Sequence, residues 1–270
     1  MHILNLLGYG PMDYMLVDSI QRKIHAQVSA LEVPDTFIIW EAQDVYTAGR
    51  KTKPEDIPDT NVPVITMDRG GSVTYHGPGQ LVVYPVIKVA PPKDVVTFVR
   101  NTETAVINAM REYQLETAQV EGRSGVWILK DGEQDKKLCA IGIKFAADTS
   151  LHGLALNVST NLERFMRVIP CGLSDAGVAT LREQGIETSL DDVAARLLPH
   201  LAKAYAPLRL RTESSDGTDI SYVSGDTSFP QLDPEEYIRE AHNSSHRAEL
   251  PPKTGVPWTQ VGTKGTSASA

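Results

Sequence analysis

The sequence predicts an α+β fold in which a mixed, largely antiparallel central sheet is flanked by helices. Seven short apolar segments are typical of strands, and several of them alternate apolar with polar residues. Three longer segments instead repeat apolar residues at helical spacing. The strand segments come in neighbouring pairs without a helix between each one, which favours this class over a doubly wound parallel sheet.

The strands and helices follow one another through the first part of the chain. We expect strands at residues 1–7, 36–42, 62–67, 80–89, 125–130, 137–145 and 152–158. The first helix is expected over residues 12–31, and its apolar face is made by Val17, Ile20, Ile24, Val28 and Leu31.

Two further helices are expected later in the chain. The second covers residues 94–113, and its apolar face is made by Val95, Phe98, Val99, Val106 and Met110. The third covers residues 189–205, with Ser189 as its N-cap, acidic residues in its first turn and Lys203 in its last.

The composition changes near Pro207, where the expected domain ends. Residues 208–270 are rich in Ser, Thr, Gly, Pro and acidic residues, and bury too little apolar surface to offset the entropy of ordering. We therefore predict one folded domain over residues 1–207 and a mostly disordered tail over residues 208–270. Within that tail, the segment PEEYIREAH could form a short helix.

Charge, cysteine content and the lengths of the apolar runs argue against several classes of protein. The net charge of −8 and the pI of about 5.4 argue against a nucleic-acid binder, which usually has a basic surface. Two cysteines are too few for a disulfide scaffold. No apolar run approaches the ~20 residues of a membrane span, and Met1–Tyr9 lacks the basic start of a signal peptide. We expect a cytoplasmic protein that binds neither membranes nor nucleic acid.

The stretch RGGSVTYHGPGQLVVYP, residues 69–85, is unusually rich in glycine. It fits neither common phosphate-binding motif, and a strand rather than a helix follows it. We interpret it as a loop whose main chain lies against a ligand, with close approach permitted by Gly70, Gly71, Gly77 and Gly79. The alternative is an ordinary hairpin that contains an incidental histidine.

The two cysteines lie in different surroundings. Cys139 lies inside an apolar strand, where a thiol acts as a small buried hydrophobe. Cys171 lies in the turn RVIPCGLSD, and turns are usually at the surface. A reactive thiol needs a cation or an imidazole nearby. The candidates for that partner are Lys137, Lys144, His76 and His152.

Taken together, the motifs resemble the lipoyl(octanoyl) transferase family. They occur in the family's order: LGYGPMDY, YTAGRKTKPEDI, RGGSVTYHGPGQLVVYP, GRSGVW, KLCAIGIK, HGLALN and PCG. The resemblance covers roughly Leu4 to Leu201, not the tail, and implies a fold shared with biotin protein ligases and lipoate ligases. One departure is AQDVYTAG, where the family frequently has His-Pro before the valine.

The resemblance implies an acyl transfer that is the first step of endogenous protein lipoylation. An octanoyl group would pass from octanoyl-acyl carrier protein to a lysine of a lipoyl domain, through a thioester on Cys171 assisted by Lys137. The expected acceptors are lipoyl domains of 2-oxoacid dehydrogenases and the glycine cleavage H protein. The family pattern implies no cofactor, since phosphopantetheine delivers the acyl group. It implies no metal either, and we expect a monomer.

The resemblance also implies which residues bind the substrate. These are Arg69, Gly70, Gly71, Ser72, Val73, Thr74, Tyr75, His76, Ala140, Ile141, Gly142, His152, Gly153, Leu154 and Ala155.

Three other functions remain open on the sequence. The first is an ATP-dependent lipoate or biotin-type protein ligase, although the phosphate-side motifs GRGR and RRxxGGGxV are absent. The second is an amidotransferase that passes octanoyl between lipoyl-domain proteins. The third is an acyl-binding module in which Cys171 is inert.

Overall fold

The computed structural model describes residues 1–57, 61–165, 176–210 and 229–243. Its centre is an eight-stranded sheet in the order β1-β2-β6-β10-β9-β8-β7, with β11 paired to β9. In that order these strands are His2–Asn5, Thr36–Trp40, Gln80–Val86, Thr149–Asn157, Lys136–Ala146, Arg123–Ile128 and Ala118–Val120, with β11 at Gly177–Val178. Two pairings are parallel and the others antiparallel, so the predicted mixed sheet is confirmed.

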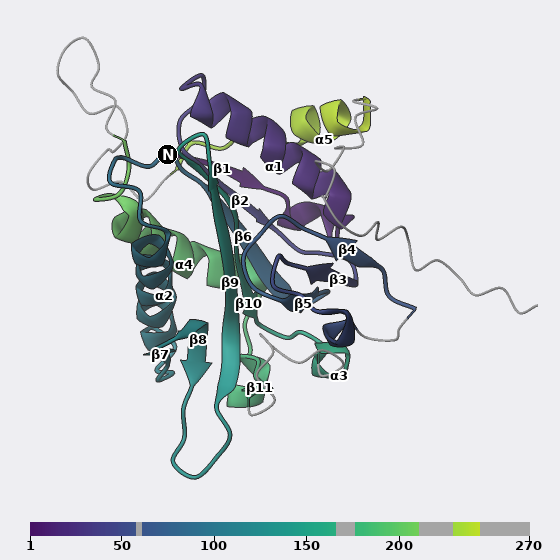
Figure 1. Cartoon of the computed structure of the whole chain (residues 1–270), viewed down its shortest axis with the longest axis vertical. Coiled ribbons are helices and arrows are strands. Elements are labelled where there is room, and N and C mark those ends of the chain that lie inside the picture. The colour runs from purple at the N-terminus through teal and green to yellow at the C-terminus, as the bar shows by residue number, and fades with distance from the viewer. Residues whose placement is uncertain (58–60, 166–175, 211–228, 244–270) are drawn as a thin grey trace, which may run out of the picture.

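A second, three-stranded sheet lies beside the first (Figure 1). Its order is β4-β3-β5, with bounds Val64–Thr66, Val45–Ala48 and Val73–His76. The sequence does not predict β3 and β5, because both are only four residues long and β5 follows directly on the glycines at 70 and 71. This sheet carries part of the glycine-rich stretch to the edge of the pocket described below.

The helices flank the central sheet as predicted. They are α1 (Tyr14–Ser29), α2 (Val95–Arg111), α3 (Leu162–Phe165), α4 (Leu190–Tyr205) and α5 (Pro234–Asn243). Side chains cap the three long helices: Asp13 accepts from Leu16 N at 2.9 Å, Asp94 from Val96 N at 2.8 Å and Ser189 from Asp192 N at 3.1 Å. Short 3₁₀ turns occur at Leu7–Tyr9, Pro54–Asp56 and Arg182–Gln184. No helix among the described residues is long and apolar enough to cross a membrane.

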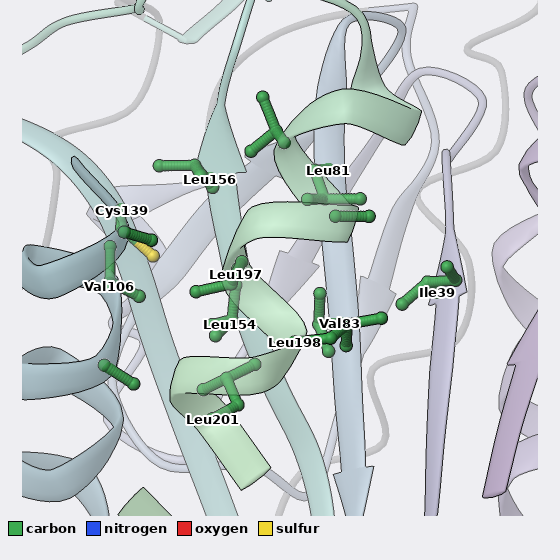
Figure 2. Close-up of a cluster of buried hydrophobic side chains, with 14 of the residues drawn as sticks. Ile39, Leu81, Val83, Val106, Cys139, Leu154, Leu156, Leu197, Leu198 and Leu201 are labelled. Carbon is green, nitrogen blue, oxygen red and sulfur yellow. The ribbon is translucent and has the colours of Figure 1, made fainter. Parts of the chain in front are cut away.

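Strand alternation gives the central sheet two different faces. Leu81 and Val83 of β6, with Leu154 and Leu156 of β10, pack under α2 and α4 in the larger core (Figure 2). Their neighbours Val82, Tyr84 and Ala155 belong to the core under α1. The pocket lies on this second face.

The chain continues to pack against the domain after Pro207. Leu210 N donates to Lys88 O at 2.8 Å, and Arg209 forms a buried ion pair with Asp35. Leu232 N donates to Ile3 O at 2.8 Å, which extends the sheet edge at β1. Residues 208–210 and 229–243 therefore differ from the predicted tail. Residues 211–228 and 244–270 lie outside the described part of the chain.

The helix that the sequence allows within the tail is present as α5. It lies against α1 (Figure 1), where Lys23 forms an ion pair with Glu240 and lies 4.8 Å from the centre of the Tyr237 ring. Tyr237 itself is buried. Leu232, Ile238 and Ala241 also pack against the core under α1, so a few apolar residues anchor a segment that is otherwise polar.

Candidate active site

A pocket opens between the α1 face of the central sheet, the second sheet and the N-terminal end of α1. The space within it is about 640 Å³, counting the part open to solvent. Its lining includes Lys137 and all but one of the predicted substrate-binding residues. The structure therefore brings together segments that lie far apart in the sequence, while their roles in binding stay predictions.

Tyr75 is the exception among the predicted substrate-binding residues, because it does not line the pocket. Its ring packs between Tyr46 and Phe165, at centroid distances of 5.4 and 5.9 Å. Its hydroxyl donates to Asp44, which belongs to AQDVYTAG, the segment that differs from the family pattern. Strand alternation turns Tyr75 away from the face of its neighbours Thr74 and His76, although Val73 at the start of the strand also lines the pocket.

A β-bulge aims Lys137 into the pocket. Val126 pairs with Cys139, but the next residue of β8, Trp127, pairs with Lys137, so β9 contains one extra residue. As a result Leu138 and Cys139, although consecutive, both pack in the core under α2 and α4. Lys137 then lies on the opposite face with Ala140 and Gly142.

The side chain of Lys137 is almost fully buried, with 2% of its surface exposed. Its Nζ lies 4.5 Å from the centre of the Trp127 ring, a cation–π contact. Ala179 N donates to Lys137 O at 3.0 Å, which ties the strand to β11. A buried amine at the wall of an apolar pocket is a group that can take part in proton transfer.

Of the two cysteines, Cys139 lies in the described part of the chain. Cys139 is fully buried, and this burial raises the pKa of its thiol well above the ordinary value, as expected for a packing residue. Cys171 lies outside the described residues. The described chain before it ends at Phe165, which lines the pocket, and resumes before Gly177, which pairs with Lys136.

Arg69 holds the glycine loop in shape. Its guanidinium donates to Gly70 O, Ser72 O and Thr47 O at 2.8, 2.9 and 2.6 Å. The stem of Arg69 crosses Gly142, where an added Cβ would lie only 3.1 Å from Arg69 Cδ. A side chain at position 142 would therefore require the Arg69 stem to shift by a few tenths of an ångström.

The four glycines of residues 69–85 have two different roles. Gly70 and Gly71 line the pocket, as the sequence predicts. Gly77 and Gly79 do not, which corrects the expectation that all four permit approach of a ligand. A Cβ on Gly77 would overlap the Tyr75 hydroxyl at 2.1 Å, and Gly79, at φ +83°, lies against Ser159.

His76 is a buried, neutral imidazole at the pocket wall. Its Nδ1 lies 2.7 Å from Gln80 Oε1, and Gln80 Nε2 donates to Asn157 Oδ1 at 2.9 Å. Asn157 Nδ2 in turn donates to Ala179 O at 3.1 Å. Because Gln80 offers an oxygen, Nδ1 carries the proton. Burial, with a smaller contribution from Arg69, lowers the pKa of His76 to about 4.

His152 lines the pocket through a different polar network. Its Nε2 lies 2.8 Å from Asp68 Oδ1, and Asp68 also accepts from Lys144 Nζ at 2.6 Å and Arg22 Nη2 at 3.1 Å. The hydrogen bond from His152, aided by the two cations, holds the pKa of Asp68 well below its usual range. Asp68 was not predicted from the sequence, because it lies far from its partners along the chain.

Five further lining residues were also missed by the sequence analysis. They are Tyr14, Val82, Tyr84, Ser124 and Phe165. Tyr84 donates to the Tyr14 hydroxyl at 3.1 Å, and burial raises the pKa of Tyr14 to about 12. Ala155 pairs with Val82, so Val82 and, by alternation, Tyr84 could have been predicted if the pairing of β10 with β6 had been known. Among the described residues, no cluster of histidine, cysteine and carboxylate side chains could hold a metal ion.

Comparison with known proteins agrees with this geometry. The family model of the lipoyl protein ligase A/B catalytic domain matches residues 13–202. An octanoyltransferase of Clavibacter sepedonicus is 47% identical over 189 residues, covering 68% of this chain and 82% of the relative. One of Leifsonia xyli subsp. xyli is 40% identical over 215 residues, covering 77% of this chain and 96% of the relative.

A solved structure shows the same fold. It is a chain from an archaeal lipoylation system of Thermoplasma acidophilum, a bipartite lipoate protein ligase and its E2 lipoyl domain. The two chains superpose with a TM-score of 0.66 over 94% of this chain and 98% of the other, at 15% sequence identity. The chain therefore belongs to the lipoyl protein ligase A/B catalytic-domain family and is an acyltransferase.

Proposed function

We propose that this enzyme transfers an octanoyl group from octanoyl-acyl carrier protein to a lysine of a lipoyl domain. The acyl group passes through a thioester on Cys171, and Lys137 moves the protons. The observation that carries the proposal is the burial of Lys137 at the wall of a largely apolar pocket. The relatives named as octanoyltransferases support the acyl group.

The ends of the undescribed segment around Cys171 support its part in the reaction. The chain leaves the described part at Phe165 in the pocket wall and returns at β11, which pairs with the strand that carries Lys137. Cys139 cannot take this part, because its thiol is buried on the opposite face and is held in the protonated form.

In the first step the Cys171 sulfur attacks the thioester carbonyl of the acyl carrier protein. Lys137 enters this step as the ammonium and stabilises the Cys171 thiolate, which forms the new carbon–sulfur bond. The bond to the phosphopantetheine sulfur breaks, and that sulfur leaves with the proton from the Lys137 ammonium. The products are an octanoyl-enzyme and the free thiol of the carrier.

In the second step the lysine amine of the lipoyl domain attacks the Cys171 thioester. Neutral Lys137 accepts a proton from the amine, the amide bond forms and the bond to Cys171 breaks. The proton stays on Lys137 beside the Cys171 thiolate, so the enzyme is restored. No cofactor is consumed in either step.

The partners follow from this chemistry. We propose that the donor is octanoyl-acyl carrier protein, which is acidic, and that it docks at Arg50, Lys51 and Lys53. All three are exposed. Their turn lies against the glycine loop, because Lys51 N donates to Gly71 O at 3.0 Å. The acceptors are lipoyl domains of 2-oxoacid dehydrogenases and the glycine cleavage H protein.

The test is a reconstitution without ATP. Purified enzyme is incubated with octanoyl-acyl carrier protein and an apo lipoyl domain, and the intact mass of the lipoyl domain is measured. We expect one octanoyl group on the lipoyl domain, an unchanged result with Cys139→Ser, and none with Cys171→Ser. Transfer that requires ATP and free octanoate would instead establish a ligase.

A further inference from the structure

The pocket is polar at the end that is remote from Lys137. His152 pairs with Ile143 on β9, six residues along that strand from Lys137. At roughly 3.3 Å per residue, the two levels are about 20 Å apart, less the shortening at the bulge. Between them the wall includes four small residues: Ala140, Gly142, Gly153 and Ala155.

An extended eight-carbon acyl group fits this interval. With C–C bonds of ~1.5 Å, its carbon chain measures about 9 Å. If its last carbon lies level with His152, its carbonyl lies level with Ala140, about three residues away along β9. The Lys137 side chain can span the remaining distance to the carbonyl. In this placement the terminal carbon of the acyl group, and not its thioester, lies beside His152.

The proton on His152 is fixed by its surroundings. Asp68 is a carboxylate that accepts three donors: His152 Nε2, Lys144 Nζ and Arg22 Nη2. A carboxylate can only accept, so Nε2 must be the protonated nitrogen. In the neutral imidazole the other nitrogen, Nδ1, is therefore a hydrogen-bond acceptor.

That acceptor is buried and has no partner in the described part of the chain. His152 is 1% exposed, and among the described residues nothing donates to its Nδ1. An unpaired buried acceptor is costly. The His152 backbone is also in the left-handed region at φ +61°, which is uncommon for a residue other than glycine and persists chiefly at functional sites.

We propose that His152 forms a hydrogen-bonding subsite for the end of the acyl chain, and that the enzyme also transfers medium-chain acyl groups with a terminal hydroxyl. The hydroxyl donates to His152 Nδ1 and takes no part in the bond changes, which are those already described at Cys171. This inference rests on the proposed octanoyl transfer. It adds a second class of substrate, the ω-hydroxyacyl thioester.

The subsite is selective for a donor. A terminal hydroxyl satisfies Nδ1, whereas a terminal methoxy group brings a second acceptor to the same place and leaves both unpaired. An acyl chain that ends in a methyl group leaves Nδ1 unpaired, as in the enzyme without substrate. The expected order is therefore hydroxyl close to methyl, and methoxy well below both.

The experiment compares octanoyl-, 8-hydroxyoctanoyl- and 8-methoxyoctanoyl-acyl carrier proteins as donors to an apo lipoyl domain. For the wild-type enzyme we expect kcat/KM for the hydroxy substrate within about tenfold of octanoyl, and at least about tenfold above methoxy. Octanoyl transfer is the internal reference. If octanoyl itself is not transferred, the proposed function fails. If octanoyl is transferred but hydroxyl and methoxy are equally poor, the subsite is overturned.

Two variants test the proton assignment. In Asp68→Asn the amide can donate to Nε2, which moves the imidazole proton to Nδ1 and makes that nitrogen a donor. The hydroxy-to-methoxy ratio should then fall by about tenfold or invert. In His152→Leu the acceptor is lost, and the hydroxy-to-octanoyl ratio should fall by a similar factor. Each ratio compares two substrates with the same protein preparation, so a loss of folded enzyme cancels. Unchanged ratios in both variants would overturn the proton assignment of His152.

Discussion

The pocket contains two buried histidines that the sequence presents alike, each followed by a glycine, and that the structure makes opposite. The Nδ1 of His76 donates to a neutral amide, and burial lowers its pKa to about 4. The Nε2 of His152 donates to the Asp68 carboxylate, between Lys144 and Arg22. The partner, and not the motif, therefore decides what each imidazole can do.

The comparison also bears on which group is the base. His76 is too weakly basic to hold a proton near neutral pH, and His152 is level with Ile143, six residues along β9 from Lys137. Both observations favour Lys137 as the proton acceptor that we propose for the reaction. The predictions below test this division of labour, beginning with the largest expected effect.

Lys137→Ala should lower the rate of octanoyl transfer by about 10² to 10⁴, the usual range for loss of a general acid–base group. The matched controls are His76→Gln and Cys139→Ser, which should retain far more activity. The measurement is kcat/KM at a fixed pH with circular dichroism to confirm folding. A larger loss in His76→Gln than in Lys137→Ala would reverse the assignment of the base.

His76 should make the fold sensitive to mild acid. Its folded pKa of about 4 lies below the value of ~6.5 expected in the unfolded chain, so the unfolded state binds more protons between these values. Stability is then lost as the pH falls from about 6.5 to 4, by up to about 3 kcal/mol.

The check for His76 is urea unfolding at several pH values. In His76→Gln, whose amide can still donate to Gln80, the slope of unfolding free energy against pH over this window should largely disappear. A wild-type protein whose stability is flat from pH 7 to pH 4.5 would show that His76 is not buried in its neutral form.

Asp68 should have a smaller and separate effect, at lower pH. Because its folded pKa is depressed, its contribution is present above the unfolded value of ~3.9 and is lost as the pH falls below it. Asp68→Asn should destabilise the protein by about 1–3 kcal/mol at pH 7, since Lys144 loses its carboxylate partner. Chemical denaturation at pH 7 and pH 3 measures both. Equal sensitivity of wild type and variant to pH 3 would argue against a strong Asp68 network.

The smallest effect is expected outside the pocket, where both histidines are untouched. Replacing Arg50, Lys51 and Lys53 with glutamine should raise the KM for the acyl carrier protein a few-fold at low salt and flatten its salt dependence. A matched control replaces Lys130 and Lys203, which are also exposed but do not line the pocket. An equal effect of the control would mean that only overall charge matters.

Much of the fold was predictable from the sequence because the apolar pattern specifies it. Strand alternation and the helical spacing placed the central sheet and its three long helices close to where they lie. The motifs at residues 69–76, 140–142 and 152–155 converge on one pocket. This worked because each motif is continuous in sequence and lies on a strand or a loop next to a strand.

The features that were not predicted depend on a β-bulge and on tertiary contacts, which a local sequence pattern does not contain. The extra residue in β9 changes which face Lys137 occupies, and simple alternation from Cys139 would give the wrong face. The Asp68–His152 pair joins residues that are 84 positions apart. The direction in which the Tyr75 ring points, and the packing roles of Gly77 and Gly79, also depend on tertiary neighbours. Residues 229–243 pack through a few apolar side chains in an otherwise polar segment, among them Phe229, Tyr237 and Ile238.

The central claim is an acyl-enzyme on Cys171 that needs Lys137 for its release. Its most direct test uses Lys137→Arg, which keeps a positive charge but, with a pKa above ~12, cannot accept a proton from the attacking amine. After incubation with octanoyl-acyl carrier protein and apo lipoyl domain, intact mass and peptide mapping should find one octanoyl group on Cys171. It should be released by hydroxylamine, with little transfer to the lipoyl domain. Normal turnover of this variant, or an octanoyl group on Cys139, would contradict the account.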